Sequence, residues 1–183
     1  ILHLAASTIE IAKTKTLTYE GASIDIGASA LSIIGGGTFT NTNPLELDHG
    51  QSQLNLSGIF ANYIRTDSNS LGITVDNSST VNDFSVGHVT PVSISPNQSF
   101  NGSINVYEDS NLQLNNTGTL AANVTISGNG GTVEAQKSMT FSGSLQQVDQ
   151  HNGFELIIAS GETMTYSGSE FDIGSHTFKL SGG

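Results

Sequence analysis

One stretch of this chain occurs twice, and that repeat constrains the fold more than any other feature. Residues 17–36 read LTYEGASIDIGASALSIIGG, and residues 164–183 read MTYSGSEFDIGSHTFKLSGG. The copies start 147 residues apart, which is seven times 21, so they are in phase with a smaller unit of about 21 residues. Within each copy, apolar pairs alternate with polar residues and recur every seven residues. Such spacing is typical of short strands joined at corners and not of an amphipathic helix.

The pattern predicts an all-β chain with almost no helix, wound as a right-handed parallel β-helix (a β-solenoid) of about 21 residues per coil. Each coil of such a fold stacks about 4.8 Å above the last, so inward side chains form apolar columns. Gly, Asn and Ser are expected to adopt the positive φ angles of the corners. Stacked Asn and Ser at equivalent corners are expected to hydrogen-bond along the stack. The alternative fold is an antiparallel β-sandwich, which also has short alternating strands.

Residues 1–183 are predicted to form a single solenoid domain, as a fragment of a longer repetitive protein. The seven-residue interval holds over 17–58 and 104–183, whereas residues 59–103 break it. This segment contains Pro91, Pro96 and the only arginine of the chain, Arg65. It is predicted to be an irregular insertion, either loop-rich coils or a projecting hairpin. Loops on a rigid scaffold often carry binding residues, so we expect function to lie here first.

Charge and composition exclude several classes of function. The chain has 16 acidic and 5 basic residues, for a net charge of −11, which argues against nucleic acid and anionic membrane surfaces as partners. No apolar run approaches the ~20 residues of a membrane-spanning helix, so no membrane insertion is expected. Cysteine is absent, which excludes disulfides, thiolate metal sites and a cysteine nucleophile.

The candidate binding residues all come from the irregular segment. They form a possible ligand-contact loop: Tyr63, Arg65, Asp67, Asp76 and Asp83. Its acids, together with Asn69, Asn77 and Asn82, are dense in the oxygen atoms that calcium prefers. No loop motif of defined spacing accompanies them, and a solvated polar loop is the other interpretation. No catalytic residue, cofactor or other metal is predicted.

The remaining polar residues are interpreted as structural. Paired carboxylates for glycoside hydrolysis need to face each other across a cleft, but the acids here are scattered along the sequence. Asp25 and Asp172 stand next to glycine in the repeated corners, where an Asp usually caps a turn. The histidines show no metal-ligand spacing and are predicted to be exposed at strand edges or corners: His3, His49, His88, His151 and His176.

Two segments, VTISGNGGTVEAQKSMTFSGSL and SEFDIGSHTFKLSGG, resemble the rungs of bacterial autotransporter passengers and filamentous-haemagglutinin-type adhesins. The resemblance lies in the general residue pattern and in the repeat period, and not in a specific motif. It covers about two thirds of the chain and leaves out 59–103. It implies a non-enzymatic structural or adhesive module of a secreted bacterial surface protein or extracellular filament. The implied partners are other copies or neighbouring repeats stacked end to end, and a host or cell-surface glycan or protein.

Three alternatives stay open from the sequence. A polysaccharide-degrading β-helix enzyme would require Arg65 and acids of 59–103 to converge in one groove. The chain could also be a segment similar to a phage tail fibre, since such fibres have the same general residue pattern. A carbohydrate-binding β-sandwich module would need an aromatic platform, but Trp is absent and the chain has only 4 Tyr and 8 Phe.

Overall fold

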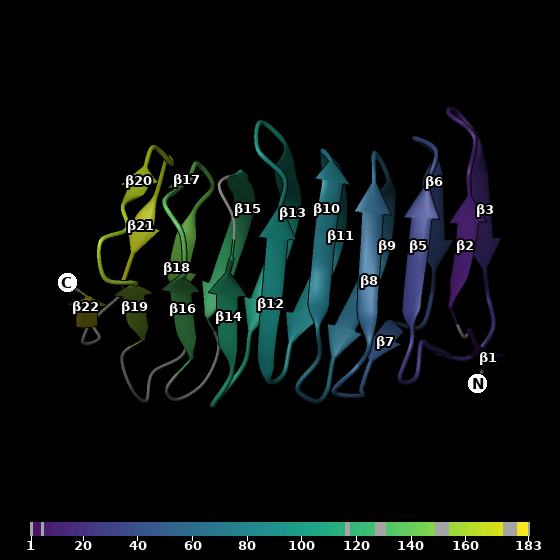
Figure 1. The fold of residues 1–183 in the computed structure, drawn as a ribbon, viewed down its shortest axis with the longest axis horizontal. Helices are drawn as coiled ribbons and strands as arrows, with labels where there is room; N and C mark the ends of the chain where they lie inside the picture. The colour runs from purple at the N-terminus through teal and green to yellow at the C-terminus, as the bar shows by residue number, and fades with distance from the viewer. Residues whose placement is uncertain are drawn as a thin grey trace.

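The computed structural model describes residues 2–4, 6–115, 118–126, 131–148, 154–173 and 179–182. They form a β-solenoid of about 8 turns with about 21 residues per turn, and the described residues contain no helix (Figure 1). Strands of successive coils pair in parallel in two sheets that run the length of the rod. The predicted solenoid is therefore confirmed. The β-sandwich alternative is wrong, because its strands would pair antiparallel.

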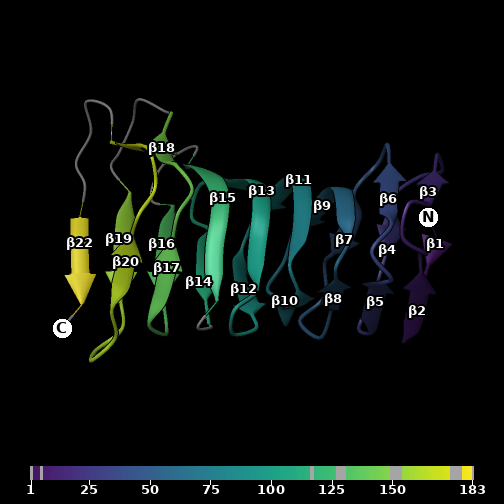
Figure 2. The same cartoon turned by 90° about the horizontal axis from the view of Figure 1, so that it is seen from above.

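The two sheets, here called sheet A and sheet B, enclose the core between them (Figure 2). The 13 strands of sheet A are β1 (Leu2–His3), β3 (Thr16–Tyr19), β4 (Ile24–Asp25), β6 (Thr38–Asn41), β7 (Leu45–Leu47), β9 (Phe60–Thr66), β11 (Ser79–Val86), β13 (Ser99–Val106), β15 (Thr119–Ile126), β17 (Met139–Phe141), β18 (Leu145–Gln147), β20 (Met164–Tyr166) and β21 (Phe171–Asp172). The 9 strands of sheet B are β2 (Ser7–Glu10), β5 (Ala30–Ile34), β8 (Gln53–Ser57), β10 (Gly72–Asn77), β12 (Val89–Ile94), β14 (Asn111–Leu114), β16 (Thr132–Ala135), β19 (Glu155–Ile158) and β22 (Lys179–Gly182).

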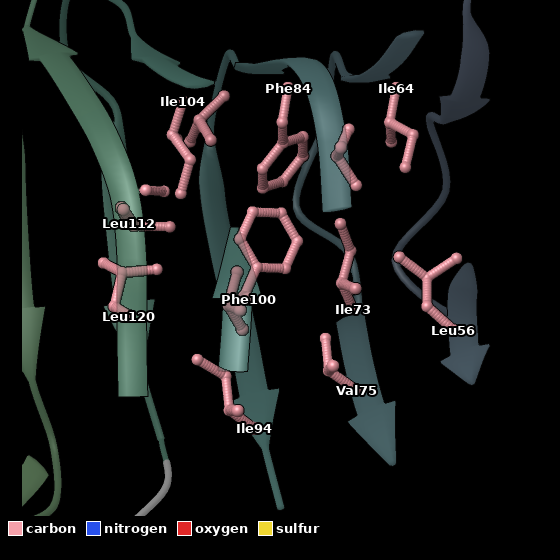
Figure 3. Close-up of a cluster of buried hydrophobic side chains, with 14 of the residues drawn as sticks. Leu56, Ile64, Ile73, Val75, Phe84, Ile94, Phe100, Ile104, Leu112 and Leu120 are labelled. Carbon is pink, nitrogen blue, oxygen red and sulfur yellow. The ribbon is translucent and has the colours of Figure 1, made fainter. Parts of the chain in front are cut away.

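Inward residues of sheet A stack in a column that explains the repeat in the sequence. Each residue of the column is the register partner of the next: Ile24, Leu45, Ile64, Phe84, Ile104, Val124, Leu145 and Phe171. Ile24 and Phe171 are equivalent positions in the two copies of the repeated stretch. The 147-residue offset is therefore seven steps of the solenoid along this column. Alternate residues of sheet B, such as Leu56 and Ile73, pack against it from the opposite side (Figure 3).

The core is densest in the middle of the rod and open at both ends. Phe84 and Phe100 are fully buried, with ring centroids 6.2 Å apart. In the N-terminal coil, Leu17 is 41% exposed, and in the C-terminal coil Leu180 is 61% exposed, because no further coil covers them among the described residues. Stacking is what buries these positions, so a terminal coil has only half of its apolar contacts.

Residues 59–103, predicted to be an irregular insertion, either loop-rich coils or a projecting hairpin, contain β9 to β12 and the first part of β13. A hairpin would pair its strands antiparallel, whereas all of these strands pair in parallel with the coils before and after them. The seven-residue interval is lost because the coils are shorter here. Leu54 pairs with Ile73, and Ile73 with Val92, so each of these steps is shorter than the average turn of about 21 residues.

Asparagine side chains hydrogen-bond along the stack, as the sequence predicted for the corners. Asn41 stands at the corner where β6 ends, whereas Asn62 and Asn82 continue the series within β9 and β11. The Asn41 side chain donates to the Tyr63 carbonyl and accepts from the Tyr63 amide, at 2.8 and 3.1 Å. Asn62 donates to the Asn41 carbonyl at 2.8 Å, and Asn82 donates to the Asn62 side chain at 3.3 Å. These bonds connect successive coils, so the asparagine series stabilises the stack.

Candidate functional site

Four of the five predicted ligand-contact residues lie together on sheet A or at its end. Tyr63 on β9 and Asp83 on β11 are register partners. Arg65 lies two residues after Tyr63, and Asp67 directly follows β9. The Asp83 carboxylate accepts a hydrogen bond from the Asn105 side chain at 3.0 Å. This surface, defined by Tyr63, Arg65, Asp67 and Asp83, is called the Arg65 face below.

The Arg65 guanidinium is held between two carboxylates. Its Nη2 lies 2.6 Å from Glu46 Oε1 and 2.7 Å from Asp67 Oδ2. Glu46 is the register partner of Arg65 on β7 in the preceding coil, a pairing that the sequence did not predict. The planar guanidinium of an arginine matches the geometry of carboxylates, which suits it to this double contact. The pair of ion contacts links two neighbouring coils on the outer surface.

Asp76 lies away from the other four residues. It is exposed on β10 of sheet B, and its carboxylate accepts a long hydrogen bond from Ser95 at 3.4 Å. The three acids considered for calcium, Asp67, Asp76 and Asp83, are therefore divided between the two sheets. These acids are close in sequence but not in space, because residues of the same coil lie on different faces of a solenoid.

Stacking brings together a different group that the sequence did not reveal. Asp25, Asp48 and His49 form the one group of three among the described residues whose potential ligand atoms lie within 4.8 Å of one another. Asp25 Oδ1 accepts the Gly27 amide at 2.6 Å, which confirms its predicted turn-capping role. Burial, and then hydrogen bonding with Asp25 and its charge, raise the pKa of Asp48. Exposed acidic groups are common on proteins without a bound ion, so the group alone identifies no metal site.

The other predicted structural residues have mixed outcomes. His49 and His88 are exposed at corners, as predicted. The side chain of His3 and the whole of His151 and His176 lie outside the described residues. Asp172 is on β21 in the last coil, exposed to solvent.

A second surface runs along the side of the rod where the chain passes from sheet A to sheet B. Three exposed apolar residues lie on consecutive coils here: Leu71 (50% exposed), Val89 (38%) and Tyr107 (47%). Asp67, Glu108 and Asp109 flank them. We call these six residues the acidic–apolar edge. The sequence did not reveal this edge, because its apolar residues belong to different coils and only the stacking brings their corners to the same side of the rod.

A cavity with a volume of about 350 Å³ lies at the C-terminal coil. Its lining is mainly aliphatic and backbone: Ile158, Ala159, Glu162, Leu180, Ser181 and Gly182. The charged group in this lining, the Glu162 carboxylate, accepts hydrogen bonds from the Ser138 amide and hydroxyl at 2.7 Å and lies 3.7 Å from Lys137. The pKa of Glu162 is accordingly lowered, first by the Ser138 side-chain hydrogen bond. This carboxylate is engaged in joining two coils.

The parts of the chain that the structure describes contain no helix long and apolar enough to cross a membrane. Comparison with known proteins adds no relative: no protein-family model, no curated protein and no solved structure matches this chain.

Proposed function

We propose that this chain is a non-enzymatic structural and adhesive module of a secreted bacterial surface protein or extracellular filament. The observation that carries the proposal is the unbroken apolar column from Ile24 to Phe171, which packs about 8 turns into one continuous rod. A rod of this kind extends surfaces away from a cell and repeats its outer side chains at every coil. The resemblance to autotransporter passengers and filamentous-haemagglutinin-type adhesins supports the extracellular location.

The proposed contacts with a host or cell-surface glycan or protein lie on the long sides of the rod. The Arg65 face offers an aromatic ring, a cation and carboxylates on a rigid sheet, which suits hydrogen bonding and stacking with a polar ligand. The net charge of −11 supports the absence of nucleic-acid partners. No metal or cofactor is required by this function.

Further coils, from neighbouring repeats or other copies, are the proposed partners at the two ends. Leu2 and Leu17 are 40% and 41% exposed in the first coil, and Phe171 and Leu180 are 38% and 61% exposed in the last. Large apolar side chains are seldom left exposed in groups unless a partner covers them. Within the described part of the chain, the outer strands β20 to β22 also have one edge without a strand beside it, where a further parallel strand could pair.

A polysaccharide-degrading enzyme is the second candidate, because Arg65 and acids do meet on one face. Against it, both carboxylates nearest Arg65 neutralise the guanidinium, and Asp76 is on the other sheet. A polysaccharide lyase needs a free base beside the abstracted proton, whereas these acids are in ion pairs.

The test uses beads coated with the whole chain, placed on surfaces that carry glycans or matrix proteins. Retention of the beads, with loss of retention on Arg65→Ser, is the expected result. In parallel, acidic and neutral polysaccharides are incubated with the chain and the products are analysed for new chain ends. Release of such ends, abolished by Arg65→Ala, would overturn the non-enzymatic proposal.

A further inference from the structure

The acidic–apolar edge combines exposed apolar side chains with net negative charge. Tyr107 and Glu108 begin the corner between β13 and β14, Val89 is the first residue of β12, and Leu71 directly precedes β10. The strands β10, β12 and β14 follow one another along sheet B (Figure 1). The corner segments 67–71, 87–88 and 107–110 contain no Lys or Arg. The cation that borders them, Arg65, is already bound to Glu46 and Asp67. Since Asp67 is paired with Arg65, the unbalanced negative charge of the edge comes from Glu108 and Asp109. The edge therefore attracts cations through these two carboxylates and also offers apolar area.

A glycine, Gly87, lies in the middle of this edge. Asp67, Gly87 and Tyr107 follow Thr66, Val86 and Val106, which are register partners on three successive strands. A Cβ at Gly87 would lie 2.5 Å from the Thr66 carbonyl oxygen, so no other residue fits there without a shift of the backbone. The Gly87 amide also donates to that oxygen at 2.9 Å. No side chain of Gly87 therefore stands on the surface between Asp67 and Tyr107.

We propose that this edge binds a protein segment in which Lys or Arg residues flank apolar anchors. Charge complementarity selects this occupant, since the chain has a net charge of −11 and the six residues of the edge include no basic one. An aromatic or aliphatic anchor would pack against Tyr107, Leu71 and Val89. The rest of the chain leaves these three side chains largely exposed to solvent. The inference rests on the proposed adhesive function and names the chemistry of a protein partner.

The edge is short, so the interaction is weak for a single module. Three coils span about 14 Å at the strand spacing of a sheet, well below the footprint of a stable protein–protein interface. Affinity in a surface protein with many modules would come from repeated contacts.

Three short synthetic peptides test the proposal on the ¹⁵N-labelled whole chain by amide chemical shifts. The first alternates Lys with Leu and Trp, the second replaces Lys with Glu, and the third replaces the apolar residues with Ser. The first peptide is expected to shift amides of 67–71, 87–89 and 107–110, and its binding should weaken as salt is added. Tyr107→Ser should weaken binding about tenfold, and Glu108→Gln should weaken it less.

Phe60→Ser is the matched control, since Phe60 is 41% exposed but lies on the outer face of sheet A. It should leave binding unchanged. Equal binding of the Glu peptide, shifts on other surfaces, or shifts of the edge by a neutral oligosaccharide alone would overturn the inference. Failure of bead adhesion with intact peptide binding would refute only the proposed function; adhesion without peptide binding would refute only this inference.

Discussion

The middle coils and the end coils build sheet A in different ways. At the two ends each coil uses two short strands separated by a corner, such as β6 with β7 and β17 with β18. In the middle, one long strand per coil replaces the pair: β9, β11, β13 and β15. Removing the corner shortens the coil. Register partners on sheet B are accordingly closer in sequence in the middle, as Ile73 and Val92 are, than at the first step, from Ser7 to Leu31. Coil length can therefore change while the inward columns stay continuous.

In the end coils the chain of sheet A changes direction at the corner between two short strands. In the middle coils the same change of direction occurs within one long strand. The register of β11 and β13 shifts between Val81 and Phe84, and Gly102, opposite Val81, has a φ of +121°. A bulge of this kind turns a strand without interrupting the sheet. The two regions show that the stacked column of inward side chains is continuous along the rod, although the number of residues in a coil varies.

The largest expected effect comes from emptying the middle of the core. Phe84→Ala removes a fully buried ring that packs on Phe100, and should lower the free energy of unfolding by about 3–5 kcal/mol. Phe171→Ala in the same column but in the last coil, where the ring is 38% exposed, should cost less than about 2 kcal/mol. Urea unfolding of both variants measures the difference; equal losses would mean that the ends are as well packed as the middle.

The bulge gives the next largest effect. At Gly102 a Cβ would lie 1.7 Å from the Val81 carbonyl oxygen, so Gly102→Ala forces a shift of the long strands and should cost about 2–4 kcal/mol. Gly161 also has a positive φ, +76°, but a Cβ there meets nothing within 4 Å. Gly161→Ala should thus cost only the local strain, about 1 kcal/mol. Thermal unfolding compares the two, and a milder effect at Gly102 would show that the bulge relaxes freely.

A buried hydroxyl pair in the middle coils gives a smaller effect. Thr66 and Thr90 are both fully buried, with hydroxyl oxygens 2.9 Å apart. The register partners of Thr66 are Leu47 and Val86, so the column around it is apolar. Thr66→Val should cost about 1–3 kcal/mol by leaving the Thr90 hydroxyl without this partner, whereas the double change to Val should be nearly neutral. A double-mutant cycle by urea unfolding tests this, and additive losses would contradict it.

The smallest effect concerns pH and the N-terminal coils. The pKa of Asp48 is raised above its ordinary value of 3.8 by burial and then by Asp25, so the folded state binds this proton more tightly than the unfolded state does. Stability should therefore fall as pH rises from 3.8 through the raised pKa. Asp48→Asn should be more stable than the natural chain at pH 7, and the difference should shrink as the pH is lowered toward 3.8. Urea unfolding midpoints of both chains, measured at several pH values from 3.8 to 7, test this. A difference in stability that does not change with pH would contradict a raised pKa of Asp48.

The sequence predicted the architecture because apolar columns leave a periodic signal. Ile24 and Phe171 matched across 147 residues because both belong to one column. For residues 59–103 the hairpin alternative is wrong, because the shortened coils break the period of the repeat while keeping the parallel pairing. The variation in coil length is also the reason why the sequence did not predict the Glu46–Arg65 ion pair or the group of Asp25, Asp48 and His49. A neighbour in the next coil can be predicted only when the length of that particular coil is known. Asp76 was grouped with Asp67 and Asp83 on sequence proximity alone, which a winding chain does not preserve.

The direction of the hydrogen bonds in the two sheets has a mechanical consequence. Because strands run across the rod, their backbone bonds point along its length, and a pull on the two ends loads the coils one after another. The thinly packed outer coils would yield first, each releasing a chain of about 21 residues that extends by about 60 to 70 Å. An attachment built from such a rod would lengthen in steps under tension before it broke.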